Sequence, residues 1–213
     1  MTQRRTVVSG NTIGDAWLDI AEVIVQSGTA SFYDGLAMRE VLEASLVIAA
    51  PDPDDAIIDR FGDAERVAWM HANFTDHAAV PELGHADSYA TCLYDYAHTG
   101  LDQVAWVIDR LRTDPLSRSA TITTFQPLID TTYIPCVSLL DFYLHEGALC
   151  QVATCHSIDF GAKGYGNLIE LAALSARVAR DLGCGVGHLT MNVKSAHIYD
   201  AEVAYVENIL RQR

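Results

Sequence analysis

The sequence has little positive charge and no long uninterrupted hydrophobic run. Lys and Arg together number 14 against 28 Asp and Glu, which gives a formal net charge of -14. Nucleic-acid phosphates attract clustered Lys and Arg, so this balance argues against a nucleic-acid polymer as partner. No segment reaches the apolar length of a membrane span, so no membrane partner is expected. A single small anion could still bind in a local basic pocket.

Paired cysteines and an export signal are also missing. The N-terminal residues carry charge but lack the apolar stretch of an export signal, which favours a reducing, cytoplasmic location with free thiols. The chain has five cysteines without tight paired spacing: Cys92, Cys136, Cys150, Cys155 and Cys184.

The chain has the composition of a folded protein with a large core. It has 213 residues, of which 50% are hydrophobic and 20% are charged. Repeats, low-complexity runs and linkers are absent from the sequence, so we predict a single domain over residues 1–213.

Hydrophobic periodicity predicts a mixture of helices and strands. Ile13, Trp17, Ile20 and Ile24 mark one face of a first helix that ends before Gly28, where a left-handed cap would be tolerated. Further helices are expected at 63–73, 101–111, 167–182 and 201–210, and strands at 41–48, 118–125, 135–144, 148–155 and 186–193. Residues 78–88 are expected to form a loop, and residues 145–147 a tight turn between two strands.

An ordered set of polar residues follows in the second half of the chain, and nothing in a packed core requires it. Its members are Cys136 after Pro135, the pair His156-Ser157, Asp159, Asn167 at the start of the 167–182 helix, and the segment Ser195-Ala196-His197-Ile198-Tyr199.

This order resembles the second half of thymidylate synthase, and the family pattern fits from Cys136 to Tyr199 without insertion or deletion. The resemblance implies an α+β fold with a large twisted mixed β-sheet packed by helices. It also implies folate-dependent one-carbon transfer, as methylation or hydroxymethylation, to C5 of a pyrimidine nucleotide or nucleoside. The implied co-substrate is 5,10-methylenetetrahydrofolate or a related methylene-pterin, and the implied assembly is a homodimer.

Cys136 is the candidate nucleophile. A pyrimidine is a poor nucleophile at C5, and a thiolate added at the neighbouring C6 turns the ring into an enolate that can attack a one-carbon unit. A lone cysteine in a strand more often packs in the core, but the surrounding pattern favours the catalytic interpretation. The resemblance implies that Asp159 hydrogen-bonds the pterin and helps to protonate the carrier. An aspartate just before Gly161 also suits a turn.

Asn167, His197 and Tyr199 are the candidate residues for the base and the sugar. An Asn side chain presents an acceptor and two donors, which suits an edge of uracil better than cytosine, and by resemblance Asn167 holds the base. The same residue suits a helix N-cap, and both roles can hold. His197 and Tyr199 alternate and so share a face, which in the family reaches the sugar 3′-hydroxyl. An isolated histidine is more often a hydrogen-bonded core or surface residue.

The match is weaker in the first half of the chain. By resemblance Tyr89 helps to order water near the proton that leaves C5. A family glutamate that organises the same water belongs on an early helix. Glu65 in the 63–73 helix fits that place best, and Glu43 is the competitor.

The phosphate end departs most from the family. The resemblance places Arg118, His156 and Ser157 there, with Arg118 reaching the partner's site in the homodimer. The family has a second arginine where Ser119 stands, an arginine where His156 stands, and another in the loop that corresponds to residues 28–35. Arg–phosphate pairs are charge-assisted, and a mainly neutral His is a weaker substitute. A ribonucleotide, a nucleoside or a modified pyrimidine therefore stands beside deoxyuridine monophosphate as a candidate substrate.

The product also stays open between methyl and hydroxymethyl. Common family members continue after the last helix with a tail that closes over the folate and excludes water, and this sequence stops soon after residue 210. Hydride from the carrier gives a methyl group, whereas attack by water gives a hydroxymethyl group, which an open site favours.

Two alternatives belong to other functional classes. His145, Cys150, Cys155 and His156 are metal-ligand types in a short interval, but zinc ligands usually come in pairs two to four residues apart on a turn. Cys150 and Cys155 are expected on opposite faces of one strand, so no metal site is predicted. The second alternative is a non-catalytic or repurposed thymidylate synthase-like binding protein, since the arginines and the tail are missing.

Overall fold

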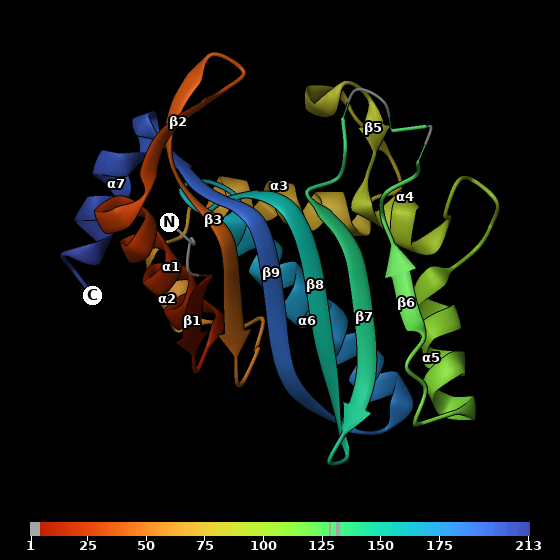
Figure 1. The fold of residues 1–213 in the computed structure, drawn as a ribbon. Helices are drawn as coiled ribbons and strands as arrows, with labels where there is room; N and C mark the ends of the chain where they lie inside the picture. The colour runs from red at the N-terminus through yellow and green to blue at the C-terminus, as the bar shows by residue number, and fades with distance from the viewer. Residues whose placement is uncertain (1–4, 128, 131–132) are drawn as a thin grey trace.

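The computed structural model describes residues 5–127, 129–130 and 133–213. Its centre is a seven-stranded mixed sheet with the order β1-β3-β9-β8-β7-β6, in which β2 also pairs with β3 (Figure 1). The strands of this sheet are β1 (Thr6–Gly10), β2 (Thr29–Tyr33), β3 (Leu36–Ile48), β6 (Ala120–Thr123), β7 (Val137–His145), β8 (Ala148–Asp159) and β9 (Gly185–Tyr199). The expected α+β fold with a large mixed sheet is confirmed.

The remaining elements are seven helices, one short 3-10 helix and a two-stranded sheet. The helices are α1 (Ile13–Ser27), α2 (Ala56–Phe61), α3 (Ala64–Thr75), α4 (Tyr89–Tyr94), α5 (Gln103–Thr113), α6 (Gly164–Leu182) and α7 (Asp200–Leu210). The short elements are β4 (Ala79–Val80), the 3-10 helix η1 (Pro81–Leu83) and β5 (Ala86–Asp87).

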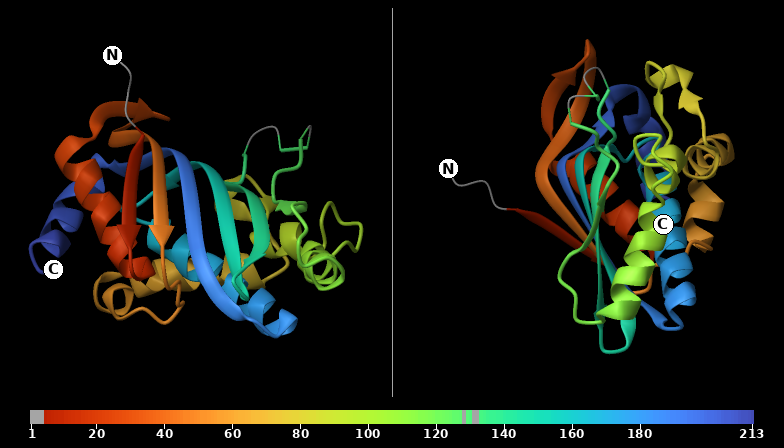
Figure 2. Two further views of the ribbon diagram at one scale, coloured as in Figure 1. Left: turned by 60° about the horizontal axis from the view of Figure 1, so that its bottom comes forward. Right: turned by 90° about the vertical axis from the view of Figure 1, so that its right-hand side faces the viewer.

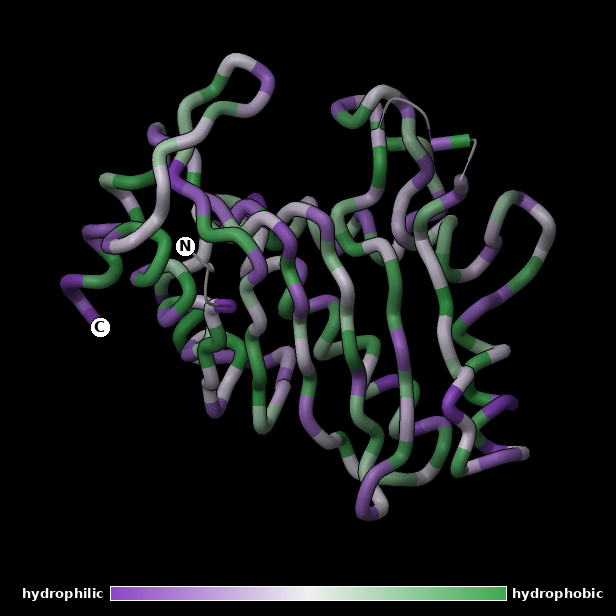
Figure 3. Tube along the Cα trace, in the orientation of Figure 1, coloured by the Kyte–Doolittle hydropathy of each residue, from purple (hydrophilic) through white to green (hydrophobic). Residues whose placement is uncertain are grey.

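Helices cover one face of the large sheet. Figure 2 shows α3, α5 and α6 on the same side of the strands, and α1 packs against β1 and β3. In the described part of the chain the opposite face carries no helix, and we call it the open face. Hydrophobic and hydrophilic residues alternate along the central strands (Figure 3), as expected when the two faces of a sheet have different surroundings.

The alternation changes phase near the upper end of the central strands. In β9, Leu189, Met191 and Val193 are buried in the hydrophobic core, and the next core positions are Ala196 and Ile198. The side chains beyond this point therefore exchange faces. In the adjacent β3, Glu43 has a φ of 56°, a left-handed conformation that non-glycine residues rarely adopt. This irregularity places polar side chains at the upper strand ends.

Local signals placed most helices correctly. Thr12 and Asp15 form a capping box at the start of α1. Gly183 ends α6 with a φ of 72°, as expected of a left-handed cap. The expected left-handed cap at Gly28 is wrong, because this residue has a φ of -63°. The turn between β7 and β8 has left-handed conformations at Glu146 and Gly147, which fits a two-residue hairpin.

Several element boundaries differ from the expectation. The expected strands 148–155 and 186–193 continue to Asp159 and Tyr199, because β8 and β9 pair as far as Asp159 and His197 and β9 pairs with β3 as far as Tyr199. The expected strand 118–125 is shorter, with β6 at Ala120–Thr123. The 78–88 segment is not entirely loop, since it contains β4, η1 and β5. The structure adds β1, β2, α2 and α4, for which no element was predicted.

Candidate active site

Cys136 lies in the loop immediately before β7, not within the strand as expected. Its side chain is half-buried, and its carbonyl oxygen accepts a hydrogen bond from the peptide N–H of His156 at 3.1 Å. The hydroxyl of Tyr133 lies 3.8 Å from the Cys136 sulfur. The loop is thereby held against β8, with the sulfur beside a phenol.

Burial raises the pKa of the Cys136 thiol above its ordinary value. The hydrogen bond from Tyr133 and the positive charge of Lys163 oppose this effect, whereas the negative charge of Asp159 adds to it. The thiol is therefore mostly protonated at neutral pH in the free protein, and the nearby cation favours the reactive thiolate.

Tyr89 packs directly behind the nucleophile. It is the first residue of α4, and its hydroxyl oxygen accepts a hydrogen bond from the peptide N–H of Val137, the residue after Cys136, at 3.0 Å. Its ring packs on Phe74 with the ring centres 4.4 Å apart. Burial and the proximity of the Cys136 thiolate raise the Tyr89 pKa. The structure thus brings Tyr89 and Cys136 together.

Asn167 lies in the first turn of α6, so its expected role as the helix N-cap is wrong. The N-cap position belongs to Lys163. Asn167 is only 4% exposed, and its amide Nδ2 donates to the Lys163 carbonyl oxygen at 3.1 Å. Within the described residues its Oδ1 atom is buried without any hydrogen-bond donor. An unsatisfied buried acceptor is costly, and such an atom suits a ligand N–H.

Asp159 ends β8 and sits beside His197. The register of the parallel strands pairs the two residues, and the Asp159 carboxylate accepts a hydrogen bond from the Gly161 N–H at 2.9 Å. Burial raises the Asp159 pKa, and the charge of Glu202 adds to this rise. His197, the Gly161 N–H and Arg66 partly oppose the shift. The carboxyl group therefore keeps its proton to a higher pH than a free aspartate, which suits a proton-transfer group.

His197 and Tyr199 lie at the end of β9 on the same side. Their rings meet edge to face with centres 5.0 Å apart. The hydroxyl of Ser157 lies 3.4 Å from Nδ1 of His197, which is 5% exposed. The predicted face with His197 and Tyr199 is present, and Ser157 joins it.

His156 points to a different set of partners. Its Nδ1 lies 3.4 Å from the hydroxyl of Ser138 on β7. Burial lowers the His156 pKa, and the charge of Lys194 lowers it further. The imidazole is therefore neutral at neutral pH.

Three predicted residues stand apart from this group. Glu65 is exposed in the first turn of α3 and lines a cavity of about 230 Å³ with Trp69 and Lys163. Glu43 is exposed on β3 and lines a second cavity on the sheet. Arg118 is exposed in the turn before β6 and donates to the Leu116 carbonyl oxygen at 2.9 Å. In the described part of the chain no hydrogen bond or ion pair joins these side chains to Cys136 or Asn167.

Sequence reasoning missed two cations at the site. Lys163 places its ammonium group 4.2 Å from the centre of the Trp69 ring, a cation–π contact. Arg66 forms an ion pair with Glu202 at 2.9 Å and donates to the Gly161 carbonyl oxygen at 3.3 Å. Lys163 could have been predicted at the site from the sequence, because it stands four residues, or about one turn of helix, before Asn167.

The described residues hold no group of three or more His, Cys, Asp or Glu side chains that could hold a metal ion. Cys150 instead lies 3.4 Å from Nδ1 of His188, whose Nε2 is 2.9 Å from the Tyr143 hydroxyl. In the same part of the chain no helix has the length and apolar character needed to cross a membrane.

The model of the thymidylate synthase family matches residues 12–213. The chain belongs to the thymidylate synthase family. It is 30% identical to the "Putative thymidylate synthase" of Methanothermobacter marburgensis, over 96% of this chain and 97% of that protein. A protein of the same name from Methanosarcina barkeri is 30% identical over 96% of this chain and 94% of its own length. The thymidylate synthase of varicella-zoster virus is 35% identical over 52% of this chain and 38% of its own.

Membership of the thymidylate synthase family supports an enzyme of that type. At the family level the reaction is folate-dependent one-carbon transfer to C5 of a pyrimidine, with methylenetetrahydrofolate as co-substrate. Apart from Tyr89, the predicted residues around Cys136 come from the segment in which the sequence resembles the family most.

Proposed function

We propose that the protein transfers a one-carbon unit from a methylene-pterin to C5 of a pyrimidine nucleotide or nucleoside through a covalent adduct with Cys136. The observation that carries this proposal is the buried Oδ1 of Asn167, which lacks a donor in the described residues. Lys163 links this amide to the nucleophile, because it accepts the Asn167 hydrogen bond and its charge acts on Cys136. A thiol and a base-reading amide therefore share one site.

The proposed reaction begins with addition of the Cys136 thiolate to C6. The electron pair of the C5–C6 double bond moves toward C4, which leaves an enolate with nucleophilic character at C5. The bound carrier supplies a carbon at the oxidation level of formaldehyde. After C5 has bonded to this carbon, the C5 proton leaves and the bond between the carbon and the carrier nitrogen breaks, which gives an exocyclic methylene on the ring. Hydride from the carrier then gives the methyl product, or water gives the hydroxymethyl product, and the Cys136 thiolate is eliminated as the C5–C6 double bond re-forms. Tyr89 lies next to Cys136 and could order water for the proton that departs.

Asp159 is the proposed acid that helps to protonate the folate carrier. Burial raises its pKa, so that it holds a proton to a higher pH than a free aspartate, and its position beside His197 is at the upper end of the strands. The cavity lined by Trp69 and Lys163 is the proposed place of the flat aromatic part of the carrier. An indole face with a cation above it suits an aromatic ligand that carries negative charge.

Uracil is the proposed base. The sugar of the substrate (deoxyribose or ribose) and its phosphorylation state are to be tested separately. The free Oδ1 of Asn167 complements the N3–H of uracil. The 4-amino group of cytosine is also a donor, so a direct comparison of the two bases decides. His197 and Tyr199 are proposed to contact the sugar, and His156, Ser157 and Arg118 the phosphate end. Methyl and hydroxymethyl are the two candidate products.

A homodimer through the open face of the sheet is also proposed. This face has no covering helix in the described part of the chain. The strands β1 and β3 of the same sheet carry the exposed apolar side chains Val7 and Leu42. In such a dimer Arg118 would reach the site of the second copy. A cytoplasmic location and a single domain over residues 1–213 remain part of the same proposal.

A repurposed binding protein is the competing function. The observation in its favour is the neutral His156 at a position where charge is expected, next to a thiol whose pKa burial raises. Such a protein would bind a pyrimidine without turning it over.

A product assay separates the two functions. The protein is incubated with methylenetetrahydrofolate and with uridine, cytidine, deoxyuridine and their monophosphates, and the products are weighed by mass spectrometry. Release of tritium from a 5-tritiated pyrimidine gives a second readout, since a binder releases none. We expect a product in which a methyl or a hydroxymethyl group replaces the C5 hydrogen, a net gain of CH2 or CH2O, and absence of both the mass shift and the tritium release with every pyrimidine would favour the binding protein.

Cys136→Ala tests the nucleophile. We expect loss of all product with the fold retained, because alanine removes the only group that can form the C6 adduct. Cys184→Ala is the matched control, since Cys184 is also half-buried but lies at the far end of α6. An active Cys136→Ala protein would refute the proposed mechanism.

A further inference from the structure

One carboxylate at the upper strand ends has no role in the proposed chemistry so far. It belongs to Glu40 on β3, whose side chain is half-buried. The hydroxyl of Ser195 on β9 donates a hydrogen bond to its Oε1. Among the described residues, no donor reaches the second carboxylate oxygen and no cation lies within ion-pair distance. Partly buried polar atoms need hydrogen-bond partners, and a ligand can supply the one that is missing here.

The sheet register places Glu40 directly beside the residues proposed to contact the sugar. Glu40 pairs with His197 across β3 and β9, and His197 pairs with Asp159 across β9 and β8. These strands lie side by side in Figure 1. Paired residues of neighbouring strands carry their side chains on the same face of the sheet, so the three residues form one row. Two residues further along, Met38 pairs with Tyr199 on the same face.

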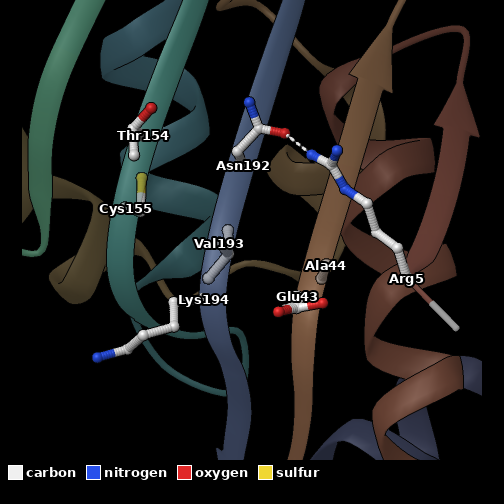
Figure 4. Close-up of a pocket in the computed structure, with 8 residues that line it drawn as sticks. All are labelled: Arg5, Glu43, Ala44, Thr154, Cys155, Asn192, Val193 and Lys194. Atoms are coloured by element: carbon white, nitrogen blue, oxygen red, sulfur yellow. Dashed lines mark hydrogen bonds between the residues drawn. The ribbon is translucent and has the colours of Figure 1, made fainter. Parts of the chain in front are cut away.

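This row is separate from the cavity on the open face. Figure 4 shows that cavity on the adjoining stretch of β3 and β9, with Glu43 and Lys194 among the side chains that line it. Of the residues that the structure describes, neither Glu40 nor His197 lines it. The left-handed conformation of Glu43 divides the two stretches of β3. Glu40 therefore belongs to the upper strand ends, where the candidate site lies.

Both Glu40 and His197 are held in place and keep one polar atom free. Ser195 stands two residues before His197 on β9, so its hydroxyl lies on the same face and fixes the Glu40 carboxylate. His197 is 5% exposed, and its Nδ1 lies 3.4 Å from the Ser157 hydroxyl. In the part of the chain that the structure describes, Nε2 of His197 has no hydrogen-bond partner. Neighbouring strands thus present a carboxylate oxygen and an imidazole nitrogen next to each other.

Two adjacent polar atoms of this kind suit two adjacent hydroxyl groups. An ionised carboxylate only accepts hydrogen bonds, and those that it accepts are charge-assisted and strong. In dinucleotide-binding folds an Asp or Glu binds the 2′-hydroxyl of ribose in this way. Ribose carries hydroxyl groups on C2′ and C3′, whereas deoxyribose carries only the one on C3′. With His197 and Tyr199 at the 3′-hydroxyl, the neighbouring Glu40 is placed for the 2′-hydroxyl.

We propose that Glu40 accepts a hydrogen bond from the 2′-hydroxyl of the sugar and makes a pyrimidine ribonucleotide or ribonucleoside the preferred substrate over its 2′-deoxy form. This preference rests on the proposed function, in which His197 and Tyr199 contact the sugar, and it names the sugar of that site. A deoxyribose would leave the free oxygen of Glu40 without a donor in the closed complex. An unsatisfied acceptor in a closed site lowers the affinity for the ligand that lacks the donor.

A comparison of matched sugars tests the role of Glu40. Product formation is measured with uridine and cytidine monophosphates and with their 2′-deoxy forms. For the wild-type protein we expect kcat/KM to be about 10- to 100-fold higher with ribose than with deoxyribose. In Glu40→Ala the ribose value should fall to about the deoxyribose value, which should itself change little. A wild-type preference for deoxyribose, or an equal loss for both sugars in Glu40→Ala, would overturn the proposal.

Two further variants separate recognition of the sugar from a structural role. Glu40→Gln keeps the size and one acceptor oxygen but removes the charge, so it should retain only part of the preference for ribose. If Glu40→Ala does not fold, Glu40→Gln decides, and a preference equal to that of the wild type refutes the proposal. Glu22→Ala is the matched control, because Glu22 on α1 is also half-buried and accepts a hydrogen bond from Gln26 at 2.8 Å. It should leave the ratio of the two sugars unchanged.

Binding measurements separate the sugar preference from the proposed function. The Cys136→Ala protein, which cannot form the covalent adduct, is titrated with the same four nucleotides in a calorimeter. If no pyrimidine is turned over by the wild type but the ribonucleotide binds at least about 10-fold more tightly, the proposed function fails and the role of Glu40 stands. If product forms while both sugars bind equally, the proposed function stands and the role of Glu40 is refuted. Absence of binding by every nucleotide refutes both.

Discussion

The two ends of the candidate site are built on different physical principles. At the proposed base end, Asn167 and Tyr89 are buried and held by hydrogen bonds to backbone groups at 3.1 and 3.0 Å. At the proposed phosphate end, Arg118 and Lys194, the neighbour of His156, are exposed, and neither forms an ion pair in the described residues. Buried polar groups demand fixed partners, whereas exposed charges are screened by solvent and tolerate replacement.

The difference explains where this chain departs from its family. The buried end keeps the Cys, Asp, Asn and His-x-Tyr residues, because a change there leaves a buried polar group unpaired. By the resemblance, the exposed end has Ser119 and a neutral His156 where the family has arginines. Four experiments sharpen or break this contrast, in order of the expected effect.

Asp159→Asn should have the largest effect of the four. We expect kcat to fall about 10²- to 10⁴-fold, because the amide cannot transfer a proton. The same change should raise the Tm at neutral pH by about 2–4 °C, which corresponds to about 1 kcal/mol for a protein of this size. Activity is measured with the preferred pyrimidine, and Tm by calorimetry.

The sign of the stability effect follows from the raised Asp159 pKa, which has burial as its main cause. The folded protein holds this proton more tightly than the unfolded chain, so the favourable contribution is complete at acid pH and is lost as pH rises through the folded-state pKa. The gain in Tm should therefore vanish near pH 3. Asp109→Asn is the control, because Asp109 is 77% exposed in its pair with Arg112. A Tm lowered at neutral pH would contradict the assignment.

Asn167→Ala tests the buried base contact. We expect kcat/KM to fall about 10²-fold or more, because the pyrimidine would lose its hydrogen-bond partner in a closed site. Asn208→Ala on the exposed part of α7 serves as the control substitution. If Asn167→Asp shifts the preference from uracil to cytosine, the amide reads the base; unchanged activity of Asn167→Ala would place base recognition elsewhere.

The pH dependence of Cys136 tests the electrostatics at the buried end. Because burial raises the thiol pKa, alkylation by iodoacetamide should accelerate about 10-fold per pH unit through neutral pH and level off only above the range of an ordinary thiol. Lys163→Met should move this profile to higher pH, since it removes the cation that favours the thiolate. Cys136→Ala supplies the background rate, and a plateau below about pH 8 would contradict the assignment.

Salt should have the smallest effect, and only at the exposed end. Raising the ionic strength from about 0.05 to 0.5 M should increase the KM of the monophosphate a few-fold, because the charges at Lys194 are screened. The KM of the nucleoside should stay constant. Lys194→Met should remove most of this salt dependence. An equal change in the KM of both substrates would show that the charge of Lys194 does not contribute to binding of the phosphate group.

Local sequence signals predicted the helices and the tight turn well. The capping box at Thr12, the glycine that ends α6 and the Glu146-Gly147 turn depend on neighbours in the chain, so they are visible in the sequence. The lengths of β8 and β9 are not, because their upper halves are stabilised by pairing with each other. The short strand β1 was missed for the same reason, since its only partner is the distant β3.

The structure shows where the predicted site residues lie, and their roles stay predictions. Cys136, Tyr89, Asp159, His197 and Asn167 are brought close to one another through the contacts described above. Glu65 lies on the expected helix, but its side chain is exposed, and its catalytic role stays a prediction. Periodicity predicts that a helix exists, and only packing decides which side chain faces the site.

The sequence by itself identified the family and predicted the chemistry, because the order of a thiol, a carboxyl group, a carboxamide group and a His-x-Tyr pair is carried by the chain. Only the tertiary structure decided that Asn167 has a free buried acceptor, that Lys163 stands beside the thiol and that Lys194 stands beside His156. These contacts are made between residues that are distant in the sequence and lie on neighbouring strands or on the helix packed against them. Hydrogen bonding and charge act through space, so their strength follows from that arrangement and not from spacing along the chain.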